Sequence, residues 1–102
     1  MARTESPVFN GAVDRLRELV GTENLIDVGY KAATPLGVSP STLVRAIKHL
    51  RDEEGFNVIY LPAQQRQNGK RAVLKILAPP GTTFGDVYYR RSHIKPITKE
   101  KV

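Results

Sequence analysis

A glycine followed closely by a serine–proline pair constrains this chain more than any other feature. Gly37 supplies the left-handed backbone that lets one helix stop and another leave at a steep angle. Ser39 is a good N-cap for a new helix, and Pro40 sits at the first helical position, where a proline fits. Val38 can fill the corner between the two helices. The segment therefore predicts two helices joined by a tight turn.

The helix after this turn is amphipathic and runs over residues 40–54. Its apolar residues recur at helical spacing on one side and are Leu43, Ala46, Ile47 and Leu50. The opposite side is small, polar and basic, with Ser41, Arg45 and Lys48. A helix of this kind suits the major groove of duplex DNA. The alternative is an ordinary surface helix, whose outer face is polar in any case.

Two further helices are predicted before the turn. The first would end at Gly21, and its apolar residues at helical spacing are Val13, Leu16, Leu19 and Val20. The second would cover residues 22–36. Pro35 removes a backbone donor from its last turn, so we expect an early end near Ala33 or Thr34.

Two strands and a polar turn follow the third helix, which Gly55 should cap. Residues 57–61 and 72–78 are rich in β-branched and aromatic side chains. The polar stretch 63–71 between them contains Asn-Gly at 68–69, a strong hairpin signal. Its cations could reach phosphates or a minor groove, and a solvated loop is the alternative.

The remaining chain predicts a short helix and a tail. Thr82 or Thr83 caps the helix, with Phe84, Val87 and Tyr88 as its expected packing residues. Tyr88 and Tyr89 could instead stack on bases, and an exposed Tyr89 could seat a dimer partner. The domain is expected to end at residue 92, and residues 93–102 form a basic tail.

The positive charge of the chain lies after the third helix. Residues 1–55 hold seven Lys or Arg against eight Asp or Glu, a net of −1. Residues 56–102 hold nine against two, a net of +7. Such a surface suits an acidic polymer such as nucleic acid. The alternative is that the positive charge only keeps a small domain soluble. Charge alone favours neither interpretation.

Composition argues against several other classes of protein. The absence of cysteine excludes disulfides and thiolate metal sites, and it favours a cytosolic setting. We find no membrane-spanning apolar run and no signal-peptide pattern. There is no carboxylate pair, nucleophile motif or phosphate-cradling glycine loop, and His49 and His93 are the only histidines. We therefore expect no enzyme activity, no metal and no cofactor.

Residues 37–46 read Gly-Val-Ser-Pro-Ser-Thr-Leu-Val-Arg-Ala. This run is similar to the Gly-Val-Ser-x-x-Thr-Val-x-Arg core of lac-repressor-type helix-turn-helix motifs. Three helices followed by a basic-tipped hairpin resemble, more broadly, the winged helix-turn-helix DNA-binding domains. The likeness covers residues 24–54, or 24–78 with the hairpin as a wing. It implies base or phosphate contacts from Ser41, Thr42 and Arg45.

A second likeness lies near the end of the chain. Residues 77–84, followed by Val-Tyr-Tyr-Arg at 87–90, resemble short helix-turn-helix modules encoded by bacteriophages. Some of those modules are joined to a catalytic domain. The resemblance implies a phage or mobile-element origin, a C-terminal partner domain, and the cytoplasm of a bacterial or phage-infected cell as the location.

These observations together predict one α+β domain, a winged helix-turn-helix, that binds double-stranded DNA as a transcription regulator. Its expected core is Val13, Leu16, Leu19, Ile26, Ala33, Val38, Leu43, Ile47, Leu50, Val58, Tyr60, Leu74 and Ile76. Its expected DNA contacts are Ser39, Ser41, Thr42, Arg45, Lys48, His49, Arg66, Lys70 and Arg71. The alternatives are a DNA-docking module of a phage packaging, recombination or nuclease assembly, and a winged helix that binds protein. The sequence also leaves open whether the protein forms a homodimer.

Overall fold

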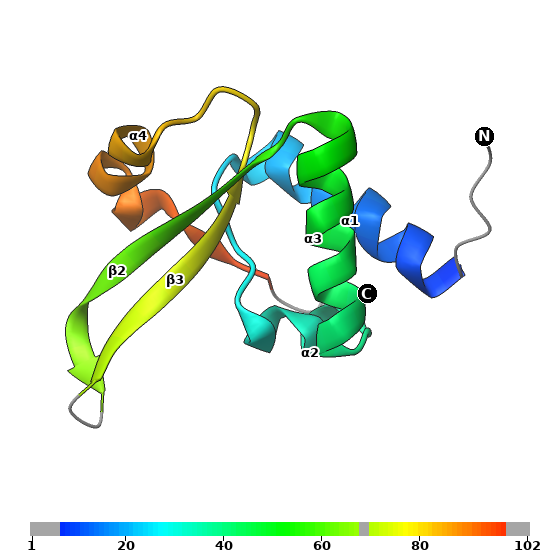
Figure 1. Ribbon diagram of the computed structural model, residues 1–102, viewed down its shortest axis with the longest axis horizontal. Helices are drawn as coiled ribbons and strands as arrows, with labels where there is room; N and C mark the ends of the chain where they lie inside the picture. The colour runs from blue at the N-terminus through cyan, green and yellow to red at the C-terminus, as the bar shows by residue number, and fades with distance from the viewer. Residues whose placement is uncertain (1–6, 68–69, 98–102) are drawn as a thin grey trace.

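The computed structural model describes residues 7–67 and 70–97, and from 63 to 72 it describes only backbone. Helices pack on both faces of a four-stranded sheet, so the class is α+β, as predicted (Figure 1). The elements in chain order are α1 (Pro7–Glu23), β1 (Ile26–Asp27), η1 (Tyr30–Ala32), α2 (Ala33–Leu36), α3 (Pro40–Glu54), β2 (Asn57–Gln67), β3 (Lys70–Ala78), α4 (Phe84–Tyr89), η2 (Arg91–His93) and β4 (Lys95–Pro96).

The sheet has the strand order β2-β3-β1-β4. Strands β2 and β3 form a long antiparallel hairpin, and β1 pairs antiparallel with β3 so that Ile26 lies opposite Leu77. Strand β4 pairs parallel with β1 on its other side. The two-residue β1 therefore joins the end of the chain to the hairpin.

Neighbouring side chains on each strand enter two separate apolar cores, because successive side chains point to opposite faces of a sheet. Leu77 packs with α1 and α3, whereas Ile76 packs with Leu61 and with Val87 of α4. The helices α1, α2 and α3 thus lie on one face of the sheet, and α4 covers the other (Figure 1).

Most of the predicted core is confirmed, and Tyr60 is the clear error. The buried members of that set are Val13, Leu16, Ile26, Ala33, Leu43, Ile47, Leu50 and Ile76. The half-buried members are Leu19, Val38, Val58 and Leu74. Tyr60 is 58% exposed because its neighbours Ile59 and Leu61 point towards α4, which turns the tyrosine to the other face.

The predicted helix over residues 22–36 is wrong. Helix α1 continues past Gly21 to Glu23, and Asn24 then takes a left-handed conformation with φ of 78°. The chain turns there into β1, whose Ile26 is buried between α1, α3 and the sheet. Pairing with β3 satisfies the backbone of this segment, so tertiary structure overrides its helical pattern. Beyond the end of α1 at Glu23, only η1 and α2 of the predicted helix are helical.

Pro35 does not end α2 early, contrary to expectation. The helix is four residues long and reaches Leu36. Pro35 lies in its first turn, where a backbone N–H would have no acceptor within the helix. The proline therefore fits without breaking the turn that leads to Gly37.

The hairpin is longer than predicted. Its strands cover 57–67 and 70–78 in place of 57–61 and 72–78. The register shifts between Pro62 and Arg66, where an advance of four residues along β2 corresponds to only two residues along β3. Such a bulge suits Pro62, which has no N–H to donate. The predicted Asn-Gly turn at 68–69 lies outside the described residues.

Thr83 caps α4, as predicted, through a reciprocal pair with Asp86. The Asp86 N–H donates to Thr83 Oγ1 at 3.1 Å, and the Thr83 N–H donates to Asp86 Oδ2 at 3.0 Å. These contacts lower the pKa of Asp86. The expectation that Phe84 and Tyr88 pack inward is wrong, because only Val87 of this six-residue helix is buried.

The expected boundary at residue 92 does not match the packing. Lys95–Pro96 forms β4, and Ile97 is 8% exposed within the core between α1 and α3. The first part of the predicted tail is therefore built into the fold. Residues 98–102 lie outside the described residues.

An ion pair joins the end of α3 to α1. The Arg17 guanidinium donates from Nε to Glu54 Oε1 at 2.8 Å and from Nη2 to Glu54 Oε2. These contacts hold the pKa of Glu54 below its ordinary value. No local sequence pattern predicts this pair, because the partners are 37 residues apart.

Glu54→Gln should lower the free energy of unfolding by up to about 1 kcal/mol near pH 7, since the pair is partly exposed. The folded pKa is depressed, so the stabilisation is present above the unfolded value and is lost as pH falls through the folded one. Urea unfolding of parent and variant should therefore differ at about pH 7 and converge at about pH 3. An equal difference at both pH values would contradict a charge-based role.

Candidate nucleic-acid interface

The turn between α2 and α3 has the predicted left-handed glycine. Gly37 has a φ of 73° and its N–H donates to the Thr34 carbonyl at 3.0 Å. The Val38 N–H donates to the Ala33 carbonyl at 3.0 Å, and the Val38 side chain is half-buried against the core. These bonds close the end of α2 and fix the direction in which α3 leaves.

Gly37→Ala should cost about 1–2 kcal/mol of stability, which is the strain of a left-handed backbone for an L side chain. A Cβ built at Gly37 meets nothing within 4 Å, so no clash adds to that cost. Thermal unfolding measures the difference. Gly21→Ala is the control, because Gly21 lies inside α1 with a similarly open Cβ position and should not lose stability.

Ser39 and Thr42 hold the start of α3. The Thr42 N–H donates to Ser39 Oγ at 3.2 Å, and the Ser39 hydroxyl donates to Thr42 Oγ1 at 3.0 Å. Pro40 occupies the first helical position, and Gly55 caps the other end with a φ of 78°. The predicted capping is thus confirmed, and it engages two of the nine expected DNA contacts.

The side of α3 away from the core presents small and cationic side chains to solvent. Ser41, Arg45 and Lys48 are exposed, as expected. Val44 is 52% exposed on the same side and was missed as a candidate. The spacing 41, 44, 48 was the signal for it. We call Ser41, Val44, Arg45 and Lys48 the outer face of α3.

Arg45 and His49 both contact Phe9 of α1. The Arg45 guanidinium carbon lies 5.1 Å from the centroid of the Phe9 ring, and the His49 ring meets Phe9 edge-on at 5.8 Å. His49 Nε2 also lies 3.7 Å from Glu54 Oε2. His49 therefore sits between α1 and α3, not on the outer face. Arg45 lies at the border, exposed but braced by an aromatic ring.

Two of the three acidic residues at the end of α3, Asp52 and Glu54, are paired with arginines. Asp52 accepts a hydrogen bond from Arg51 Nε at 2.9 Å, which lowers the pKa of Asp52. Glu54 is held by Arg17, as described above. Both carboxylates lie near the C-terminal end of the helix, away from Ser41. The cations of the outer face are thus nearest the N-terminal and middle turns.

The three hairpin cations come together in the strand register. Arg66 lies opposite Arg71, and Gln67 lies opposite Lys70. Their side chains lie outside the described residues. In Figure 1 the far end of the hairpin and the N-terminal end of α3 lie along the same lower edge of the molecule. In this view the two predicted contact regions lie along one edge, apart from each other.

Within residues 7–67 and 70–97, no group of three or more histidine or acidic side chains could hold a metal ion. The helices of that part are also too short or too polar to cross a membrane. In comparisons with protein-family models, curated proteins and solved structures, nothing matches this chain.

Proposed function

We propose that this chain is a winged helix-turn-helix domain that binds duplex DNA, with α3 in the major groove. The observation that carries the proposal is the N-capped α3, which leaves a tight glycine turn with an outer face that is small and cationic. Such a helix fits the width of the major groove. The strand order and the long hairpin that follows α3 support the same assignment.

Each residue of the outer face has chemistry that suits the groove. Ser41 lies at the helix start, where backbone N–H groups favour phosphate. Val44 offers an apolar contact for a thymine methyl group. Arg45 can bond a guanine edge with two donors, and its position over Phe9 limits the conformations that it must lose. Lys48 suits a phosphate, which needs only a point charge.

Electrostatic attraction must come mainly from beyond α3, because residues 1–55 carry a net charge of −1. The hairpin cations Arg66, Lys70 and Arg71 supply it in this proposal, through contacts with the sugar–phosphate backbone. Backbone contacts position a protein on DNA, whereas base contacts select the sequence. Helix α3 would choose the site, and the hairpin would hold the duplex.

Lys48→Ala tests the docking of α3. It should weaken duplex binding for all sequences alike and reduce the slope of log affinity against log salt by about one. Arg90→Ala is the matched control, since it removes the same charge from the far face of the sheet and should leave the slope unchanged. Fluorescence anisotropy of a labelled duplex measures both. If both variants lose the same affinity, the effect comes from net charge alone, and the docking of α3 in the groove is contradicted.

As the biological role we propose transcriptional regulation through a preferred site. Selection from random duplexes, followed by sequencing, should enrich one sequence, and a palindrome would indicate a homodimer because site symmetry mirrors protein symmetry. Enrichment of no sequence would favour the alternative, a module that docks a larger assembly on DNA.

A further inference from the structure

Helix α4 carries three exposed aromatic rings that the duplex proposal does not use. Tyr89 is 85% exposed, Phe84 51% and Tyr88 44%. The Phe84 and Tyr88 rings are stacked with centroids 6.2 Å apart, and Tyr89 meets Tyr88 edge-on at 5.5 Å. The Arg91 guanidinium lies 4.6 Å above the Tyr88 ring. Grouped rings of this kind on a surface mark a binding site, whereas single ones do not.

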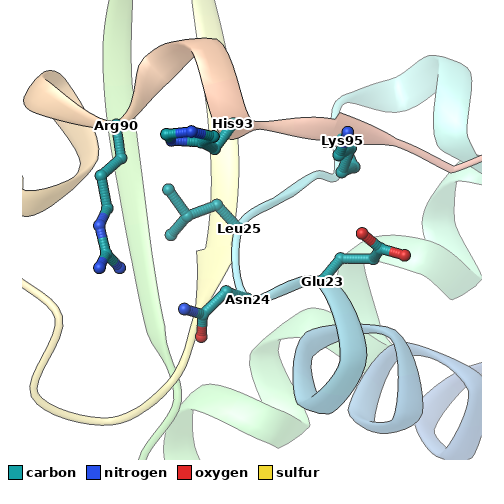
Figure 2. Close-up of a pocket in the computed structure, with 6 residues that line it drawn as sticks. All are labelled: Glu23, Asn24, Leu25, Arg90, His93 and Lys95. Atoms are coloured by element: carbon teal, nitrogen blue, oxygen red, sulfur yellow. The ribbon is translucent and has the colours of Figure 1, made fainter.

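Two hollows are lined by residues of this part of the chain. One, of about 370 Å³, is lined by Tyr88, Tyr89, Arg91 and Ser92. The other, of about 350 Å³, is lined by Glu23, Asn24, Leu25, Arg90, His93 and Lys95. Figure 2 shows that Arg90 and His93 reach towards one space beside Leu25, while the Glu23 carboxylate lies away from Arg90. One hollow is thus lined by two tyrosines and Arg91, and the other by Arg90, His93 and Lys95 together with residues 23–25.

We propose that residues 84–95 bind single-stranded nucleic acid. The exposed ring of Tyr89 would stack on a base, with the Tyr88 ring and Arg91 beside it, and Arg90 and Lys95 would face the neighbouring phosphates. Aromatic platforms joined to a cationic groove are how proteins hold single strands without reading sequence. Arg91, already placed over a ring, adds a second planar cation for the same purpose.

Charge and base pairing distinguish a single strand from the two other candidate ligands, which are a second copy of the chain and duplex DNA. Arg90, Arg91 and Lys95 outnumber Asp86 and Glu23 on this surface, so a second copy of the chain would bring two net positive surfaces together. In duplex DNA the bases are already stacked and paired, and the rings would find no free base face. A separated strand offers both unpaired bases and phosphates.

The surface of α4 is separate from the proposed duplex site on α3. Val87 anchors α4 on the face of the sheet opposite α1 and α3. Variants of α3 should therefore change duplex binding alone, and variants of α4 should change single-strand binding alone. A result on one surface does not decide the other.

The probe is a labelled thymidine oligonucleotide of about 12 nucleotides, within the roughly 4–16 that such platforms cover. Tyr89→Ala should weaken its binding about 5- to 150-fold, the effect of losing one stacked base. Tyr89→Trp should keep the affinity of the parent, because it also has a planar ring. Tyr89→Leu, which is apolar but not planar, should bind as weakly as Tyr89→Ala. Tyr60→Ala is the control, because Tyr60 is an exposed tyrosine on the other face of the hairpin.

A second probe isolates stacking from charge. An abasic oligonucleotide of the same length should bind the parent weakly and should not respond to Tyr89→Ala. The chain has four tyrosines and no tryptophan, so intrinsic tyrosine fluorescence should be quenched by the thymidine probe and not by the abasic one. Lys48→Ala should leave both measurements unchanged.

Either of two results would overturn the inference. Equal binding of the thymidine and abasic probes would mean that the rings take no part. A Tyr89→Ala variant that binds the probe like the parent would also overturn it. If analytical ultracentrifugation without nucleic acid then shows a dimeric parent and a monomeric variant, α4 joins two copies of the chain.

Discussion

Leu50→Ala is expected to lower the free energy of unfolding by about 2–5 kcal/mol, a large part of the roughly 5–15 kcal/mol that stabilises a domain of this size. Leu50 is fully buried in the core between α1 and α3. Its backbone carbonyl also accepts the N–H groups of Gly55 and Phe56 where α3 ends. Truncation to alanine leaves a cavity in the contact between α1 and α3, and this contact positions the outer face of α3. Urea unfolding followed by circular dichroism measures the change.

Val44→Ala provides the matched control on the same helix. Val44 is half-exposed on the outer face, and alanine favours helix more than valine does. Its stability should stay within about 0.5 kcal/mol of the parent. Similar losses in the two variants would mean that α3 does not pack through the face that contains Leu50.

Removal of the hairpin cations should have the largest effect on function. In the triple variant Arg66→Ala, Lys70→Ala, Arg71→Ala, the slope of log duplex affinity against log salt should fall by about 2.7, or 0.9 for each lost phosphate contact. At low salt the affinity should fall by roughly two to three orders of magnitude, alike for all sequences. Anisotropy titrations over a range of salt concentrations measure both quantities.

The matched control removes three charges from the segment that follows α4, away from the hairpin strands, in the variant Arg90→Ala, Arg91→Ala, Lys95→Ala. Its net charge equals that of the hairpin variant, so any effect of total charge is shared. Its duplex slope should remain close to that of the parent. A slope that falls equally in both variants would place no duplex contact at the hairpin.

Local signals were sufficient to predict α3. Its start and end depend on Ser39, Pro40 and Gly55, which act through their own turns of backbone. The same holds for Thr83 at the start of α4. Strand β1 could not be predicted in this way, because its two residues gain their structure from β3, about 50 positions later in the chain.

The candidate site was predictable where it depended on helical spacing alone. Ser41 and Lys48 follow from the period of the helix. The contacts of Arg45 and His49 with Phe9 depend on how α1 crosses α3, which no local pattern encodes. The rings of Phe84 and Tyr88 were expected inside because of their apolar surface. A helix of six residues against one sheet face buries only Val87, so they remain outside.

Titration of the isotopically labelled protein with duplex DNA, followed by amide NMR shifts, tests the central claim most directly. We predict that the shifts concentrate at Ser41, Val44 and Lys48 and along the hairpin, while the outward residues of α1, such as Gly21 and Thr22, stay unchanged. The account is contradicted if duplex at low salt moves no amide of α3, or if the largest shifts lie on α1.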